Sequence, residues 1–150
     1  MRFFSRQQAN TRTCVQFALN NCLQQNCVSE SELDSIALHL AVTEMAGDSN
    51  LYKNKKSVAD YYRHLRTSNG WSIRVARQYF LDHSIAHEWD VAFSPLEFNP
   101  GRYFLRTRIN QSLHAIAIVD GMLLDSLLDE PIPWTRDLNY TILLACRVIL

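Results

Sequence analysis

Apolar residues in the first half of the chain recur at helical spacing. The first such stretch spans residues 13–27, where small and aliphatic side chains stand three or four positions apart: Val15, Ala18, Leu19, Cys22 and Leu23. A second helix is expected to begin at the capping-box pattern Ser29-x-x-Glu32 and to end at Gly47. Two further helices are expected, one over 58–66 and one after the turn at 68–70.

The second half changes to short runs rich in β-branched and aromatic residues, which is typical of strands. Strands are expected over 86–93, 101–108, 113–119, 122–128 and 140–150. Prolines stand between several of these runs and separate them. Helices followed by strands, without alternation, predict an α+β domain.

One hairpin in this half permits a geometric argument. Asp120-Gly121 lies between two apolar runs, which is a strong signal for a two-residue type I′ turn. With these residues as the loop, Ile116 stands opposite Asp125. Side chains alternate with period two, so His114 and Asp125 share a face as diagonal neighbours. The pattern predicts a His–Asp pair, which is either a buried structural pair or part of a reactive site.

Cys14 is expected near the N-terminal end of the first helix. There the helix dipole and free N–H groups favour an anion and lower the pKa of a thiol. A neighbouring histidine, held by a carboxylate, would complete a nucleophile that cleaves acyl bonds. Such a site also needs oxyanion donors, and upstream amides can supply one: Gln7, Gln8 or Asn10. The alternative is a small buried core residue.

Composition narrows the class of protein. The 150 residues, 47% hydrophobic and 20% charged, fit one globular domain over 1–150. Fifteen basic residues balance fifteen acidic ones, so nucleic acid is not expected as a partner. No apolar run approaches the roughly 20 residues of a membrane span, and membrane binding is not expected either.

The four cysteines match no zinc-ligand spacing. With no secretory signal at the N-terminus, we expect reduced thiols and a cytoplasmic location. Cys22 and Cys146 are predicted to be core residues. His83 and His87 have a metal-compatible spacing but no third ligand in the sequence, so neither a metal nor another cofactor is expected.

Several segments together resemble the Josephin domains. The stretch CVQFALNNCLQ is similar to the opening helix of that family, which reads Cys-x-x-His-x-Leu-Asn-Asn-x-Leu-Gln. SESELDSIALHL, GWSIRVARQYFLDHSI and LHAIAIVDGMLLDSLL resemble its later helices and its His–Asn/Asp hairpin. The weakly similar zones are 45–69 and 86–112.

Josephin domains are papain-like cysteine peptidases that remove ubiquitin. The resemblance therefore implies a papain-like fold, Cys14 as nucleophile, His114 as general base and acid, and Asp125 as the residue that orients His114. It implies ubiquitin as the partner and assigns binding of its apolar patch to the region of Trp71 and Ile73. A core role for Ile73 is the alternative, and a monomer is expected.

The chain also departs from the family pattern. Phe17 replaces the family histidine three residues after the nucleophile, and Ala9 stands where the family has its oxyanion glutamine. Gln8 is the preferred oxyanion donor, because it has the papain spacing. These changes suggest a distant member, viral or bacterial, acting in a host cytosol. The alternatives are a peptidase for a viral polyprotein or a ubiquitin-like modifier, and a ubiquitin-binding module without activity.

Overall fold

The computed structural model describes residues 3–6, 13–47, 57–67, 70–89, 100–135 and 138–149. Within these ranges the helices come first and the main sheet follows, so the α+β prediction is confirmed. The helices are α1 (Cys14–Leu23), α2 (Glu30–Gly47), α4 (Val58–Leu65) and α5 (Ile73–Asp82). A two-stranded ribbon, β1 (Arg66–Thr67) and β2 (Gly70–Trp71), joins α4 to α5.

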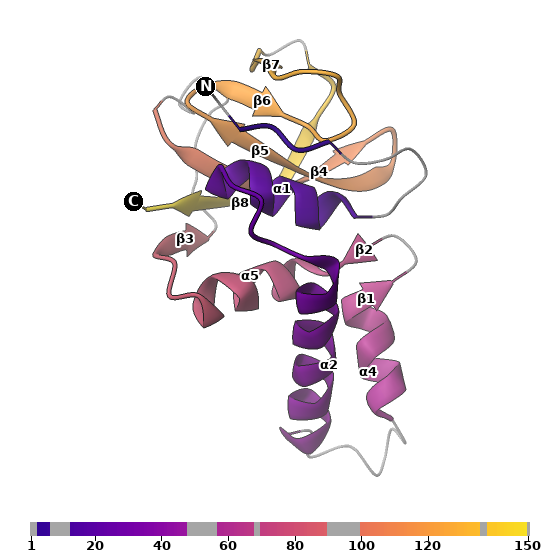
Figure 1. The fold of residues 1–150 in the computed structure, drawn as a ribbon. Helices are drawn as coiled ribbons and strands as arrows, with labels where there is room; N and C mark the ends of the chain where they lie inside the picture. Colours follow the sequence, from indigo (N-terminus) through magenta and orange to yellow (C-terminus); the bar gives the residue numbers. More distant parts are fainter. Residues whose placement is uncertain are drawn as a thin grey trace.

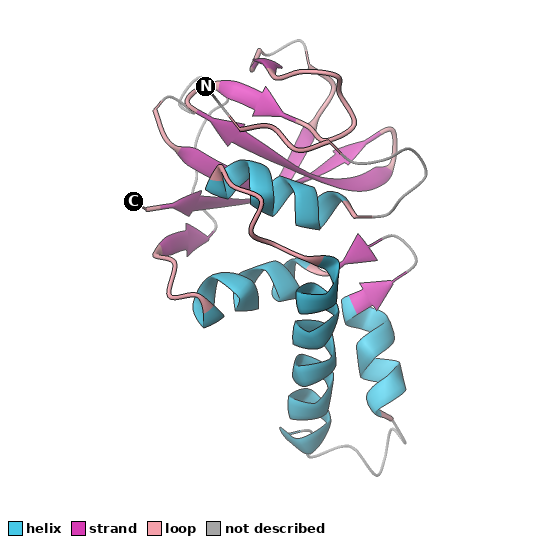
Figure 2. Cartoon of the chain, viewed as in Figure 1, coloured by secondary structure: helices cyan, strands magenta, loops and turns pink. Residues whose placement is uncertain are grey.

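The main sheet has six antiparallel strands in the order β3-β8-β4-β5-β6-β7. Its long central strands are β4 (Arg102–Ile109), β5 (Ser112–Val119) and β8 (Thr141–Val148). The short strands are β3 (His87–Trp89), β6 (Met122–Leu124) and β7 (Ile132–Pro133). Figure 1 shows α1 lying across one face of this sheet, with α5 on the far side of α1 and the α2–α4 pair projecting away. Figure 2 separates the helical part from the sheet by colour.

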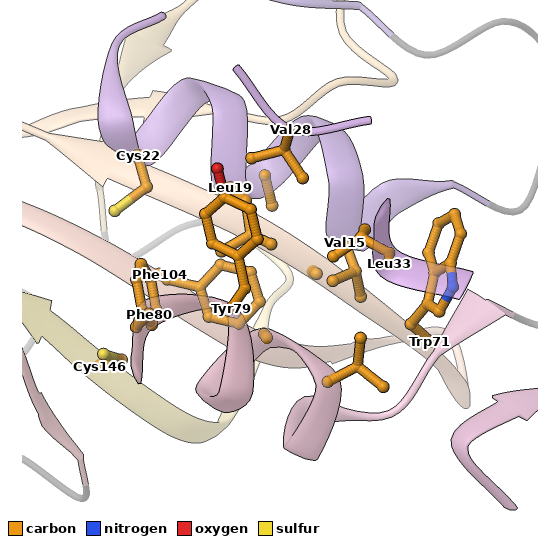
Figure 3. Close-up of a cluster of buried hydrophobic side chains, with 14 of the residues drawn as sticks. Val15, Leu19, Cys22, Val28, Leu33, Trp71, Tyr79, Phe80, Phe104 and Cys146 are labelled. Atoms are coloured by element: carbon orange, nitrogen blue, oxygen red, sulfur yellow. The ribbon is translucent and has the colours of Figure 1, made fainter. Parts of the chain in front are cut away.

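Both faces of the sheet are buried, as the double apolar pattern of β5 requires. The face toward α1 carries Phe104, Ala115 and Ala117, which join a core shared with all four described helices. Figure 3 shows this core, where Phe104 and Phe80 meet beneath Leu19 of α1. The opposite face carries Ile116, Ile118 and other apolar residues, against which Leu128, Ile132, Trp134, Leu138 and Tyr140 pack.

The hairpin has the predicted turn and register. Ile118 pairs with Leu123, and the φ angles of Asp120 and Gly121 are 51° and 78°, the positive values that a type I′ turn requires. The expectation of a strand over 122–128 is wrong, because β6 ends at Leu124. The predicted pair of Ile116 with Asp125 is therefore absent from the ladder.

Asp125 instead begins a turn. Its carbonyl accepts a hydrogen bond of 2.9 Å from the Leu128 N–H, and its carboxylate Oδ1 accepts one of 3.0 Å from the Leu127 N–H. Aspartate favours such turns because its side chain binds the backbone two residues on. The turn chemistry of Asp125 thus ends the strand.

The first helix ends earlier than predicted, whereas the second has the predicted bounds but forms only half of its capping box. α1 ends at Leu23 rather than near 27, because Gln24 adopts a left-handed conformation with a φ of 61°. Ser29 Oγ accepts from the Glu32 N–H at 3.2 Å, as a capping box requires. The Glu32 carboxylate, however, binds His83 Nε2 at 2.5 Å, so it extends away from the helix start toward α5.

The buried amide of Asn20 fixes the loop after α1. Asn20 is fully buried, and its Oδ1 accepts hydrogen bonds from the N–H groups of Cys27 and Val28, at 3.0 and 2.8 Å. Asn20→Ala leaves these donors without that partner, so we expect the free energy of unfolding to fall by about 2 kcal/mol. Urea unfolding followed by circular dichroism measures this loss.

The control for this substitution is Gln25→Ala, at an exposed position in the same loop. It is expected to change the free energy of unfolding by no more than about 0.5 kcal/mol. Equal effects of the two substitutions would show that the Asn20 hydrogen bonds contribute nothing specific.

Candidate active site

Cys14 is the first residue of α1, as its sequence position predicted. It is 5% exposed and lies over the start of β5, where the backbone of Ala115 hydrogen-bonds to its sulfur. The positive end of the helix dipole is directed at this position. The dipole of α1 and the backbone of Ala115 therefore both favour a negative charge on the Cys14 sulfur.

His114, the third residue of β5, provides the second contact of the thiol. Its imidazole hydrogen-bonds to Cys14, and its Nε2 lies 2.7 Å from Asp125 Oδ1. An ionised carboxylate only accepts, so Nε2–H donates to Asp125 and Nδ1 is the ring nitrogen left for Cys14. The predicted contact between His114 and Asp125 is confirmed, and the structure adds Cys14 to it.

The pKa values of this group favour an ion pair. Burial pushes the pKa of Cys14 upward, but the hydrogen bond and charge of His114, the Ala115 N–H and the charge of Arg106 outweigh it and lower that pKa. Burial alone would lower the pKa of His114, but Asp125 and Cys14 raise it to about 9. The two changes in pKa act in the same direction, since both favour a thiolate beside an imidazolium over a neutral thiol beside a neutral imidazole.

Asp125 holds its charge through three hydrogen bonds. Besides His114 and the Leu127 N–H, it accepts at Oδ2 from the hydroxyl of Tyr140, 2.5 Å away. Burial opposes the charge, yet these donors and the nearby imidazolium lower the pKa of Asp125. Burial and the neighbouring carboxylate in turn raise the pKa of Tyr140, so it remains a hydroxyl donor.

Sequence reasoning missed Tyr140. It lies just before β8, and its ring packs against Trp134 with centroids 5.9 Å apart. One signal was present in the sequence: a buried aspartate offers about four acceptor positions, and a histidine fills one. That signal asks for further donors without indicating which residue supplies them.

The other cysteines have different surroundings. Burial raises the pKa of Cys22, and it raises that of Cys146 to about 12. Both lie in the core cluster of α1 and the sheet, as predicted, and Figure 3 shows their sulfurs among aromatic and aliphatic side chains. Cys27 is exposed. Cys14 thus combines burial with a lowered pKa.

The amides of the α1 motif tie down the N-terminal segment. Asn21 exchanges two hydrogen bonds with the backbone of Ser5, at 2.6 and 3.1 Å, and Gln24 exchanges two with Phe3, both at 3.1 Å. Arg6 reaches the turn after Asp125. The predicted oxyanion donors follow this segment and lie outside the described residues: Gln7, Gln8 and Asn10.

Trp71 and Ile73 differ in exposure. Trp71 is 1% exposed: its indole N–H donates to Asp34 at 2.9 Å, and Arg66 stacks on its ring. Its side chain therefore has almost no surface to offer a docked protein and instead fixes α2 against the β1–β2 ribbon. Ile73 begins α5 half-buried against the main core, so of the two it retains surface for a partner.

A groove of about 440 Å³ opens elsewhere, between α2 and α4. Its lining includes Leu38, Val58 and Tyr62 and none of the residues around Cys14.

The described ranges hold no cluster of three or more histidine, cysteine or acidic side chains able to bind a metal. No helix within them is long and apolar enough to cross a membrane.

The chemistry available at Cys14 is nucleophilic. A lowered thiol pKa, an imidazole that can take or give a proton, and a carboxylate fixing that imidazole are the components of acyl transfer.

No known family model matches the chain, and no curated protein matches its sequence.

Proposed function

We propose that this chain is a papain-like cysteine peptidase of the Josephin type. It hydrolyses the peptide or isopeptide bond that joins the C-terminus of ubiquitin to another protein. The observation that carries the proposal is the connected group of Cys14 at the start of α1, His114 on β5 and Asp125 in the turn after β6. The lowered pKa of Cys14 and the raised pKa of His114 are the directions that this chemistry needs.

Acylation begins from the ion pair. The Cys14 thiolate attacks the carbonyl carbon of the scissile bond, and a tetrahedral oxyanion forms. The backbone N–H of Cys14, at the start of α1, is a candidate donor to this oxyanion. The side-chain amide of Gln8 is the proposed second donor. The C–N bond then breaks as His114 gives its proton to the leaving amine, and a thioester remains on Cys14.

Deacylation reverses the role of the imidazole. Neutral His114 takes a proton from water, whose oxygen attacks the thioester carbonyl, and the C–S bond breaks to regenerate the thiolate. Asp125 holds the Nε2–H side of the ring through both steps. Tyr140 and the Leu127 N–H hold Asp125 in turn.

Ubiquitin as the substrate rests on the resemblance of the α1 motif and the hairpin to Josephin domains. Asn21 and Gln24, two of the matching motif residues, bind the segment that leads toward the oxyanion donors. The proposed surface for ubiquitin is the start of α5 at Ile73. A reducing compartment such as the cytosol fits a reaction that needs a free thiol, and Cys14 is a free thiol.

A ubiquitin with a C-terminal electrophile tests the proposal. Intact-mass analysis is expected to show one ubiquitin bound covalently to the wild type and none to Cys14→Ala. Cys27→Ser, which removes the exposed thiol, is the matched control and should form the adduct as the wild type does.

Each outcome separates the alternatives. An adduct that persists in Cys14→Ala would contradict Cys14 as nucleophile. Selective alkylation of Cys14 by a small reagent, without any ubiquitin adduct, would keep the peptidase and remove ubiquitin as its substrate. If the protein binds ubiquitin but Cys14 reacts with neither reagent, the chain is a binding module without activity.

A further inference from the structure

A half-buried guanidinium lies on the same side of the sheet as Cys14. Arg106 of β4 stands opposite Ala115, the residue whose backbone contacts the Cys14 sulfur. Phe104, two residues earlier on β4, packs into the α1 core, so Arg106 also faces α1. Its Nη1 lies 3.5 Å from the carbonyl oxygen of Trp71, at the limit of a hydrogen bond.

A cation in this place is unfavourable by itself. The N-terminal end of α1 already carries a partial positive charge, and a buried charge without a partner is costly. Among the described residues, no aspartate or glutamate forms an ion pair with Arg106. Burial accordingly lowers the pKa of Arg106, and the charge of Cys14 opposes that change.

Arg102 shows the contrast on the same strand. It lies four residues before Arg106 and therefore on the same face of β4, but at the other end of α1. Its Nη1 donates to the carbonyl of Leu23 at 3.1 Å, where the negative end of the helix dipole favours a cation. The C-terminal end of α1 therefore stabilises the charge of Arg102, whereas the helix offers no such partner to Arg106.

The ionised Cys14 site carries a net negative charge, which can stabilise the positive charge of Arg106. A thiolate, an imidazolium and an aspartate sum to one negative charge on Cys14, His114 and Asp125. Among the described residues, the charged groups that act on the Cys14 thiol are His114 on β5 and Arg106 on β4. Arg106 brings the sum to zero.

We propose that the Arg106 guanidinium is a second counter-ion of the Cys14 thiolate, beside the His114 imidazolium. It acts by charge from β4, on the face of the sheet toward α1, with its Nη1 near the Trp71 carbonyl. This inference rests on the proposed function, because it explains how that site keeps its nucleophile ionised. Arg106 is thus a positioned charge and takes no part in proton transfer.

The rate of Cys14 alkylation against pH tests the proposal without any ubiquitin. Iodoacetamide, a small neutral reagent, is applied to proteins carrying Cys27→Ser, and the added mass is followed with time. In Arg106→Gln, which removes the charge but keeps a polar side chain, the midpoint of the profile is expected to rise by about one pH unit. Below both midpoints this is about a tenfold slower reaction. Arg106→Lys keeps the charge and should stay close to the parent protein.

Arg102→Gln is the matched control, because it removes an arginine from the same strand and face. Its midpoint should equal that of the parent. An unchanged midpoint in Arg106→Gln, or equal shifts in the Gln and Lys variants, would overturn the counter-ion. A parent protein whose Cys14 titrates like an ordinary thiol would instead contradict the proposed function itself. Circular dichroism confirms that each variant is folded.

Discussion

Replacing His114 with alanine is expected to lower kcat/KM for hydrolysis of a ubiquitin C-terminal amide by about a thousandfold. Two losses combine. The leaving amine has no proton donor, and Cys14 loses the hydrogen bond and charge that outweigh burial and lower its pKa. Alkylation of Cys14 at neutral pH should therefore slow as well, which separates loss of the nucleophile from loss of proton transfer.

The matched control is His64→Ala, which removes an exposed histidine from α4. Its kcat/KM and its alkylation rate should equal those of the wild type. A His114→Ala protein that is folded and keeps more than about a tenth of the activity would exclude His114 as the general base and acid.

Replacing Asp125 with alanine is expected to lower kcat/KM by about a hundredfold and to change its pH dependence. In the proposed mechanism, acylation needs protonated His114, so its pKa of about 9 is expected to set the alkaline limit of activity. Asp125 raises that pKa by its hydrogen bond and charge. Without Asp125 the imidazolium loses its proton at lower pH, so the alkaline limb should move down by at least about one unit. A pH series of initial rates measures both effects.

Two milder substitutions separate charge from orientation. Asp125→Asn keeps a carbonyl oxygen that can accept from Nε2–H, so the alkaline limb should move down while about a tenth or more of the activity remains. Tyr140→Phe removes one donor to Asp125 and keeps the ring packed on Trp134. It should lower activity less than Asp125→Ala does. If the alkaline limb stays in place in Asp125→Ala, the carboxylate does not control His114.

The sequence itself determined the local features of this site. Cys14 begins α1, and Asp120-Gly121 forms the predicted turn, because helix periodicity and turn chemistry act between neighbours along the chain. The hairpin register followed from that turn. It brought His114 close to Asp125, although Asp125 lies in a turn rather than opposite Ile116 in the ladder.

The tertiary structure alone decided the partners that come from other elements. The Tyr140 hydroxyl reaches the Asp125 carboxylate from just before β8, 15 residues further along the chain. Arg106 comes to the N-terminal end of α1 because β4 and β5 pair beneath that helix. No period or turn signal carries this information, because these contacts depend on how the packed core places α1 across the sheet. The burial of Trp71 follows from the same packing, which turned a predicted binding residue inward.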